Sequence, residues 1–197
     1  MEPSTIFALG AVIFAISSIY FYVRPQKRDT YNSPLLVSLI TLVSQCVMAA
    51  GLLVSTGSDG EQLHWTRWAA YIASCTLLMW VIADRVMLSL KYKIELMYLT
   101  AITMVTGAFA SVTEGAAMVL FFIIGGFTYV LMMRLIWMGN MNKLYPIKKY
   151  IYFGWSVFPF VFILSPEGFG IIPLALALVI YLVLDIFSKI VFYLEIK

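Results

Sequence analysis

Seven apolar stretches, separated by short polar turns, run through the chain and constrain its fold more than any other feature. A helix needs about 20 apolar residues to cross the hydrocarbon core of a bilayer, and each stretch comes close to that length. Within lipid, only helices and closed barrels satisfy all of their backbone hydrogen bonds. We therefore predict an all-α, seven-transmembrane helix bundle. Its expected spans cover residues 4–23, 34–55, 65–90, 96–112, 116–138, 147–164 and 171–194.

Composition also indicates an integral membrane protein. Of the 197 residues, 62% are hydrophobic and 12% are charged, whereas soluble domains are about half apolar and a quarter charged. We expect a single domain over residues 1–197 in the cell membrane, with the lipid bilayer as its partner and no enzyme activity. The net charge of +3 is scattered over the turns, so we expect no nucleic-acid binding. Cys46 and Cys75 fall inside predicted spans, so neither a disulfide nor a metal site is expected.

The turns differ in charge from one to the next. Turns after the first, third and fifth spans hold the basic residues Arg24, Lys27, Arg28, Lys91, Lys93, Lys143, Lys148 and Lys149. Turns after the second, fourth and sixth spans hold the acidic residues Asp59, Glu61, Glu114 and Glu167. Because Lys and Arg gather on the cytoplasmic side of membranes, we predict an extracellular N-terminus and a cytoplasmic C-terminus.

Two charged residues interrupt the last apolar stretch. Asp185 and Lys189 are four residues apart, so on a helix they lie on one face, one turn from each other. A lysine at bilayer depth is costly and is by default a candidate functional residue with a partner. A lysine in a dry pocket beside a carboxylate is suited to forming a Schiff base with an aldehyde. The pair therefore predicts a chromophore-binding protein.

The third span carries a polar stripe. At 100° per residue, Arg67, Tyr71, Ser74 and Arg85 fall on one side of the helix. Arg67 and Arg85 share an azimuth and lie roughly 27 Å apart along the axis. Arg85 either faces the interior or extends to the interface. We favour an inward role for Arg67, because small and polar residues follow it.

Three motifs on three spans resemble those of a microbial rhodopsin. They are Trp65-x-Arg67-Trp68-Ala69-x-Tyr71, Trp155-Ser156-x-Phe158-Pro159 and Leu184-Asp185-x-x-Ser188-Lys189. The resemblance covers the whole chain and implies all-trans retinal bound covalently at Lys189, with Asp185 as counterion. It also implies that aromatic side chains enclose the polyene, which needs a flat apolar slot. The implied retinal-binding residues are Trp155, Phe158, Pro159, Tyr71, Cys75, Leu78, Thr106, Gly107, Phe162 and Tyr181.

Within that family the chain resembles the schizorhodopsins, which move protons inward and carry a Phe-Ser-Glu signature. Of the three signature positions only Ser74 matches, since Ala70 and Val81 replace the others. Ala70 also stands where outward pumps place their proton acceptor, so Asp185 is the expected sole carboxylate counterion. Asp84, one turn beyond Val81, either accepts a proton released inward or pairs with basic groups at the surface.

The resemblance thus implies an inward light-driven proton pump that uses Asp185, Arg67, Ser74 and Asp84, with protons as the transported ion. Two alternatives stay open. One is a photosensory or non-pumping pigment, and the other is a light-gated channel. The family also implies a homo-oligomer, which we expect to be a trimer.

Overall fold

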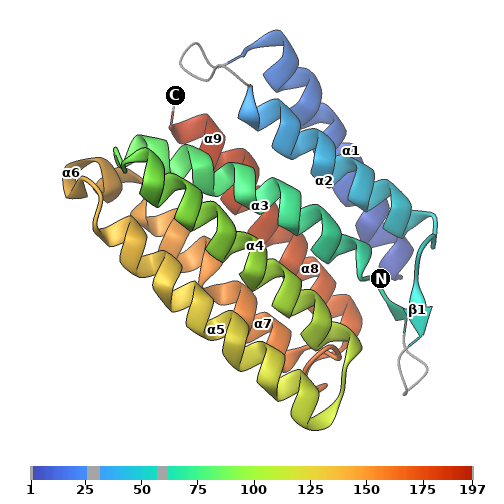
Figure 1. Cartoon of the computed structure of the whole chain (residues 1–197). Coiled ribbons are helices and arrows are strands. Elements are labelled where there is room, and N and C mark those ends of the chain that lie inside the picture. The colour runs from blue at the N-terminus through green and yellow to red at the C-terminus, as the bar shows by residue number, and fades with distance from the viewer. Residues whose placement is uncertain (1, 26–31, 57–61, 197) are drawn as a thin grey trace.

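The computed structural model describes residues 2–25, 32–56 and 62–196, which form a bundle of long, roughly aligned helices (Figure 1). Five described spans are long and apolar enough to cross a membrane: α1 (Pro3–Val23), α3 (Thr66–Arg85), α4 (Leu90–Val112), α5 (Gly115–Trp137) and Leu174–Glu195. A shorter apolar helix, α2 (Ser33–Ala49), and a bent pair, Met141–Ile147 with Tyr150–Leu164, complete the set. The predicted all-α bundle of seven spans is confirmed.

The sixth and seventh spans each consist of several helical segments. The sixth contains α6 (Met141–Leu144), a 3₁₀ turn (Tyr145–Ile147), a π-helical turn (Tyr150–Trp155) and α7 (Val157–Leu164), with a bend of 57°. The seventh contains α8 (Leu174–Asp185), a second π-helical turn (Ile186–Val191) and α9 (Phe192–Glu195).

A proline lies just beyond the π-helical turn of the sixth span. Pro159 has no backbone N–H, so the carbonyl of Trp155, four residues earlier, loses its α-helical partner. The π-helical turn ends at Trp155, just before α7. Single π-helical turns occur frequently at functional sites. In this chain one such turn presents Trp155 and the other presents Lys189.

Two predicted span ends are wrong because the backbone turns earlier than the apolar composition suggests. The second span was expected to reach Ser55, but α2 ends at Ala49. Gly51 then adopts a left-handed conformation with φ +62°, as glycine commonly does after a helix. Beyond it, β1 (Ser55–Thr56) pairs antiparallel with β2 (Gln62–Leu63).

The junction of the third and fourth spans differs in the same way. The third was expected to end at Leu90, but α3 ends at Arg85 and Met87 takes a φ of 60°. As a result α4 begins at Leu90 rather than Leu96. Lys91 and Lys93 therefore lie in the first turn of a helix instead of in a loop.

Basic residues gather at the end of the bundle that holds the C-terminus. Figure 1 shows the α3–α4 turn, α6 and the C-terminus at that end, and the N-terminus, β1 and the α4–α5 turn at the other. The first group includes Lys91, Lys93, Lys143 and Lys148. Of the turn residues used to predict orientation, Lys27, Arg28, Asp59 and Glu61 lie outside the described residues.

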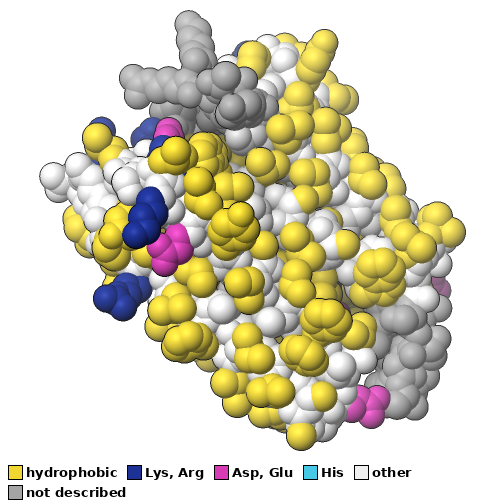
Figure 2. Space-filling model, viewed as in Figure 1, with side chains coloured by type: hydrophobic (Ala, Val, Ile, Leu, Met, Phe, Trp, Pro, Cys, Tyr) yellow, Lys and Arg dark blue, Asp and Glu magenta, His cyan; other side chains and the backbone are white. Residues whose placement is uncertain are grey.

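The outer surface suits a bilayer. Consecutive helices from α1 to α5 pack on one another, and α8 contacts α1 and α7. On the face drawn in Figure 2, apolar side chains cover the middle of the molecule and charged side chains gather toward its ends. The chain is a multi-pass integral membrane protein.

Candidate functional site

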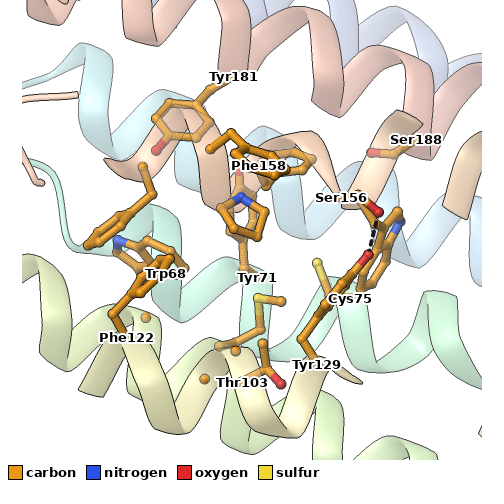
Figure 3. Close-up of a pocket in the computed structure, with 18 of the residues that line it drawn as sticks. Trp68, Tyr71, Cys75, Thr103, Phe122, Tyr129, Ser156, Phe158, Tyr181 and Ser188 are labelled. Atoms are coloured by element: carbon orange, nitrogen blue, oxygen red, sulfur yellow. Dashed lines mark hydrogen bonds between the residues drawn. The ribbon is translucent and has the colours of Figure 1, made fainter. Parts of the chain in front are cut away.

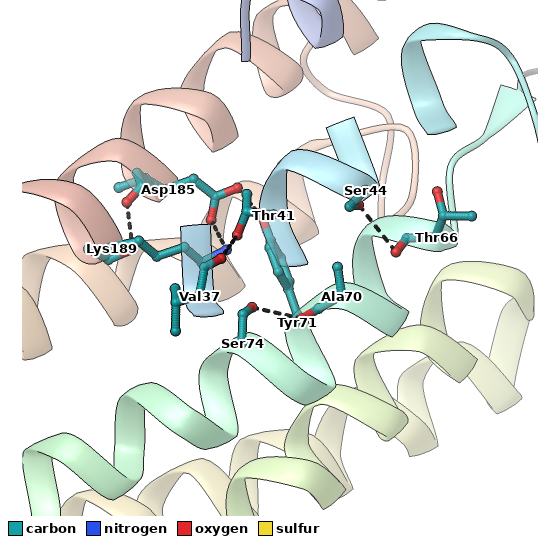
Figure 4. Close-up of polar contacts among 11 residues, drawn as sticks. Val37, Thr41, Ser44, Thr66, Ala70, Tyr71, Ser74, Asp185 and Lys189 are labelled. Carbon is teal, nitrogen blue, oxygen red and sulfur yellow. Dashed lines mark hydrogen bonds and ion pairs between the residues drawn. The ribbon is translucent and has the colours of Figure 1, made fainter. Parts of the chain in front are cut away.

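Lys189 and Asp185 form a buried ion pair in the seventh span. Each is 2% exposed, and Lys189 Nζ lies 2.7 Å from Asp185 Oδ1 (Figure 4). The contact lacks the alignment of a hydrogen bond, so neither atom has a hydrogen-bond partner among the described residues. The predicted one-turn spacing on a single helical face is confirmed. Because a buried charge is tolerated only with a partner, each group depends on the other.

Helix α3 holds the pair from the opposite side. The Tyr71 hydroxyl donates a hydrogen bond of 3.0 Å to Asp185 Oδ2, and Lys189 Nζ lies 4.3 Å from the centre of the Tyr71 ring. Ser74 is fully buried one turn further on, and its Oγ donates to the Ala70 carbonyl at 2.7 Å. Ala70 itself brings no polar side chain, so Asp185 is the carboxylate that faces Lys189 in the described chain.

A second ion pair lies toward the N-terminal end of α3. Arg67 is 4% exposed and pairs with Glu167, which lies just after α7. The guanidinium carbon also lies 4.1 Å from the centre of the Tyr181 ring. From the sequence, Glu167 is an acidic turn residue that resembles the acidic residue at the extracellular end of the sixth span in outward pumps of the family, but its pairing with Arg67 could be found only once the turn after α7 was placed.

His64 precedes α3 and packs beside this pair. Its ring meets Phe7 edge-on at 4.6 Å between ring centres, and neither ring nitrogen has a hydrogen-bond partner in the described structure. Burial, and then the positive charge of Arg67, lowers the pKa of His64 from 6.5 to about 4. The histidine is therefore neutral near pH 7.

An apolar cavity of about 270 Å³ begins at the Lys189–Asp185 pair. Aromatic side chains from α3, α5, α7 and α8 face this space (Figure 3). Phe158 stacks on Tyr181 at 5.8 Å and meets Tyr71 edge-on at 5.8 Å. The volume is near the lower end of the roughly 300–1,000 Å³ typical of small-molecule sites.

Most of the residues predicted to bind the chromophore line this cavity. They are Lys189, Trp155, Phe158, Pro159, Tyr71, Cys75, Gly107, Phe162 and Tyr181, together with Asp185.

Two predicted binding residues, Leu78 and Thr106, are not in the cavity wall. Leu78 is buried in the main hydrophobic core. The Thr106 hydroxyl donates to carbonyls of its own helix and lies behind Gly125. Their contact with a chromophore stays a prediction.

Sequence reasoning missed the wall supplied by α5, and on α4 it identified Gly107 but not Thr103 and Met104. Gly125, Gly126 and Tyr129 line the cavity on α5, and the Tyr129 hydroxyl shares a hydrogen bond of 2.7 Å with Ser156. The adjacent glycines, with a tyrosine one turn later, were the available signal. Without knowing how close α5 lies to α7, that signal could not be assigned to a site.

Asp84 lies at the surface rather than along the interior stripe. Its side chain is 68% exposed and pairs with Lys93 of α4. Of the two roles weighed for Asp84, this contact is the surface pairing with a basic group. Arg85 is half-buried, and its Nη1 donates to the Ile196 carbonyl at 3.3 Å, so it reaches the C-terminal segment.

A bundle of membrane spans around an apolar cavity, with a buried lysine in the wall, defines a membrane-embedded chromophore protein. The family model described as bacteriorhodopsin-like protein matches residues 2–194. The chain belongs to this family of microbial rhodopsins.

Individual relatives agree. The crystal structure of schizorhodopsin 4 superposes with a TM-score of 0.92 at 33% identity, covering 100% of both chains. Sensory rhodopsin-2 of Haloarcula vallismortis is 24% identical over 93% of this chain and 82% of its own length. Bacteriorhodopsin of Halobacterium salinarum is 25% identical over 94% of this chain and 79% of its own length.

Proteins of this family bind retinal through a Schiff base to a lysine, and the cavity fits that group. Lys189 is buried at the cavity wall. The lining is almost wholly apolar and aromatic, as a polyene requires. At Gly107 a Cβ would overlap the Trp68 ring, so glycine there keeps the wall from being pushed inward.

Proposed function

We propose that this protein is a light-driven inward proton pump in which Lys189 carries the retinal and Asp185 is its counterion. The observation that carries the proposal is the buried Lys189–Asp185 pair, 2.7 Å apart, at the wall of the apolar cavity. Ala70 supports the inward direction, because outward pumps of this family place a proton acceptor at that position. The bound retinal would supply light absorption and a light-driven change of shape.

The residues around the pair would hold a proton on Lys189 Nζ in the dark. A charge in a low-dielectric pocket needs a nearby opposite charge. Asp185 provides that charge, and Tyr71 keeps the carboxylate oriented through its hydrogen bond. Trp155, Phe158 and Pro159 would confine the polyene, and the apolar lining would exclude bulk water.

The outer end of the site is closed in the proposed orientation, with the N-terminus extracellular and the C-terminus cytoplasmic. The Arg67–Glu167 pair and Tyr181 lie between the counterion and that end. The basic end of the bundle would then face the cytoplasm. A proton that leaves Lys189 Nζ toward the extracellular side would meet the buried Arg67–Glu167 pair.

Release on the cytoplasmic side would pass Ser74 and reach the surface near Asp84. Ser74 is fully buried, and Ile82 and Val86 are buried apolar residues beyond it. From Ser74 to Ala83 the sequence of α3 contains no carboxylate. Asp84 is therefore the first acidic group along α3, and at the surface it could attract a released proton without storing it.

The lack of a carboxylate on α3 between Ser74 and Ala83 also favours a second candidate function, a photosensory pigment. With no carboxylate on α3 to relay protons before Asp84, isomerisation could alter helix packing for a partner without net transport. A slow photocycle and no pH change on illumination would identify this function.

Light-induced pH recording tests the proposal. Cells that express the protein are given all-trans retinal and illuminated in unbuffered suspension. We expect the external medium to become more alkaline, and a protonophore to abolish the change. Cells with Lys189→Ala provide the matched control. Acidification of the medium, or no pH change from a coloured pigment, would contradict inward pumping.

A further inference from the structure

A second, much smaller cavity lies on the other side of the counterion. Its volume is about 10 Å³, and helices α1, α2, α3 and α8 enclose it. Four polar side chains line it: Gln45, Arg67, Tyr181 and Asp185. A volume of about 10–15 Å³ is what one water molecule requires.

Each of these four side chains has polar atoms without a hydrogen-bond partner among the described residues, although Asp185 Oδ1 is ion-paired with Lys189 Nζ. These atoms are Gln45 Oε1, Arg67 Nε, Arg67 Nη1, the Tyr181 hydroxyl and Asp185 Oδ1. All four side chains are at most 6% exposed. A buried polar group without a hydrogen bond costs about 1–3 kcal/mol, so several such groups around one space indicate that a small polar molecule binds there.

The set of donors and acceptors selects water. Arg67 offers N–H donors, whereas Gln45 Oε1 and Asp185 Oδ1 are acceptors. One water can accept from Arg67 and donate to both oxygens. An anion would face the carboxylate and the amide oxygen, and a cation would face the guanidinium. Neither suits this space.

Gln45 is held at the cavity by close packing against α1. A Cβ at Gly10 would lie 2.8 Å from both Gln45 Cδ and Oε1, so a larger residue at this position would displace the amide. Because Gly10 has no side chain, the Gln45 amide can occupy this space against α1. Leu182 packs against the same point of α1 and, with Gln45, lines the cavity.

We propose that this cavity binds one ordered water, and that Gln45 is a positioning residue that acts through this water on Asp185. The inference rests on the proposed function, in which Asp185 is the counterion of Lys189. It extends the counterion's surroundings to α2, which supplies no charged group. Through the water, Gln45 favours the ionised form of Asp185, because the water that Gln45 holds donates to the carboxylate.

Other ionisable groups also face Asp185. From α3 they are Arg67, Tyr71 and Cys75, and from the seventh span they are Tyr181 and Lys189. None of these is changed when Gln45 is replaced. An effect of Gln45 is therefore separable from theirs.

Gln45→Met tests the proposal, because methionine is similarly long and unbranched but lacks the amide. Ser44→Ala is the control, since Ser44 is a buried polar neighbour on α2 that bonds to the Thr66 carbonyl at 3.4 Å outside the cavity. In the retinal-loaded protein, we expect Gln45→Met to move the acid-induced colour change to higher pH by about one unit, a tenfold change in proton affinity. Ser44→Ala should leave it in place. Equal midpoints for wild type and Gln45→Met would overturn the role of Gln45.

A structure of the wild-type protein at a resolution that shows waters tests the binding site itself, with or without retinal. We expect density within hydrogen-bond distance of Gln45 Oε1 and an Arg67 nitrogen. A dry cavity, or one closed by a rotated side chain, would overturn the proposal. If no coloured pigment forms, the proposed function fails, and this density alone decides whether the water is bound.

Discussion

Tyr71 on α3 donates a hydrogen bond of 3.0 Å to Oδ2 of Asp185 at the end of α8. The other carboxylate oxygen, Oδ1, lies 2.7 Å from Lys189 Nζ. A hydrogen bond to a charged acceptor contributes about 1.5–3 kcal/mol. The state of the ion pair in the seventh span therefore depends on one hydroxyl from the third.

Tyr71→Phe should weaken the counterion. Loss of the hydroxyl removes a hydrogen bond that favours the carboxylate, so protonation becomes easier. In retinal-loaded protein the midpoint of the acid-induced colour change should rise by about one to two pH units. Tyr129→Phe is the control, because that hydroxyl bonds to Ser156 in the same cavity. Similar shifts of the midpoint in both variants would show that the Tyr71 hydroxyl does not specifically stabilise the Asp185 carboxylate.

The Arg67–Glu167 pair should be strongly coupled. Arg67→Gln leaves a buried carboxylate without its partner, which costs about 3–5 kcal/mol. Adding Glu167→Gln removes that unpaired charge, so the double variant should recover most of the lost stability. Thermal unfolding of the wild type, both single variants and the double variant gives the coupling energy. Additive effects of the two changes would mean that the pair does not interact in the protein.

His64 should make the protein sensitive to mild acid. Its pKa is about 4 when folded and about 6.5 in an unfolded chain, so the unfolded state binds the proton first. The contribution of neutral His64 to the free energy of unfolding is therefore fully present above pH 6.5, and it is lost as the pH decreases from 6.5 toward 4. His64→Leu removes an unpartnered buried ring and should flatten this part of the curve. The melting temperature measured across that range tests it, and an unchanged slope would refute the assignment.

Two glycines of the cavity wall should respond differently to alanine. A Cβ at Gly107 would overlap the Trp68 ring, whereas one at Gly126 meets nothing within 4 Å. Gly107→Ala should therefore displace Trp68, lower the melting temperature and slow the uptake of retinal. Gly126→Ala should do neither. Stopped-flow absorption during reconstitution measures the uptake, and equal rates in the two variants would argue against a tight wall at Gly107.

The parts of the fold that depend on the bilayer were predictable from the sequence. Apolar length alone located all seven spans, because lipid requires about 20 apolar residues per helix. The closeness of Asp185 and Lys189 followed from helical periodicity, which places residues four apart on one face. These predictions needed no knowledge of how the helices pack.

The features that depend on tertiary packing could not be predicted. Val86 and Leu88 are apolar and buried, so nothing in composition indicated that the chain turns at Met87. Gln45 was missed because a lone amide in an apolar span gains meaning only when Arg67 and Asp185 are placed beside it. The position of Asp84 one turn beyond Val81 left two roles open, and only the packing of α4 shows that Asp84 pairs with Lys93 at the surface.

The most direct test of the central claim is the absorption spectrum after reconstitution with all-trans retinal. Wild type, Lys189→Ala and Asp185→Asn are titrated with acid and base. We predict a visible band in the wild type and no such band in Lys189→Ala. In Asp185→Asn the band should move to much shorter wavelength at neutral pH, because the proton on Lys189 Nζ loses its counterion. A Lys189→Ala protein that keeps the full visible colour, or an Asp185→Asn protein that titrates like the wild type, would contradict the account.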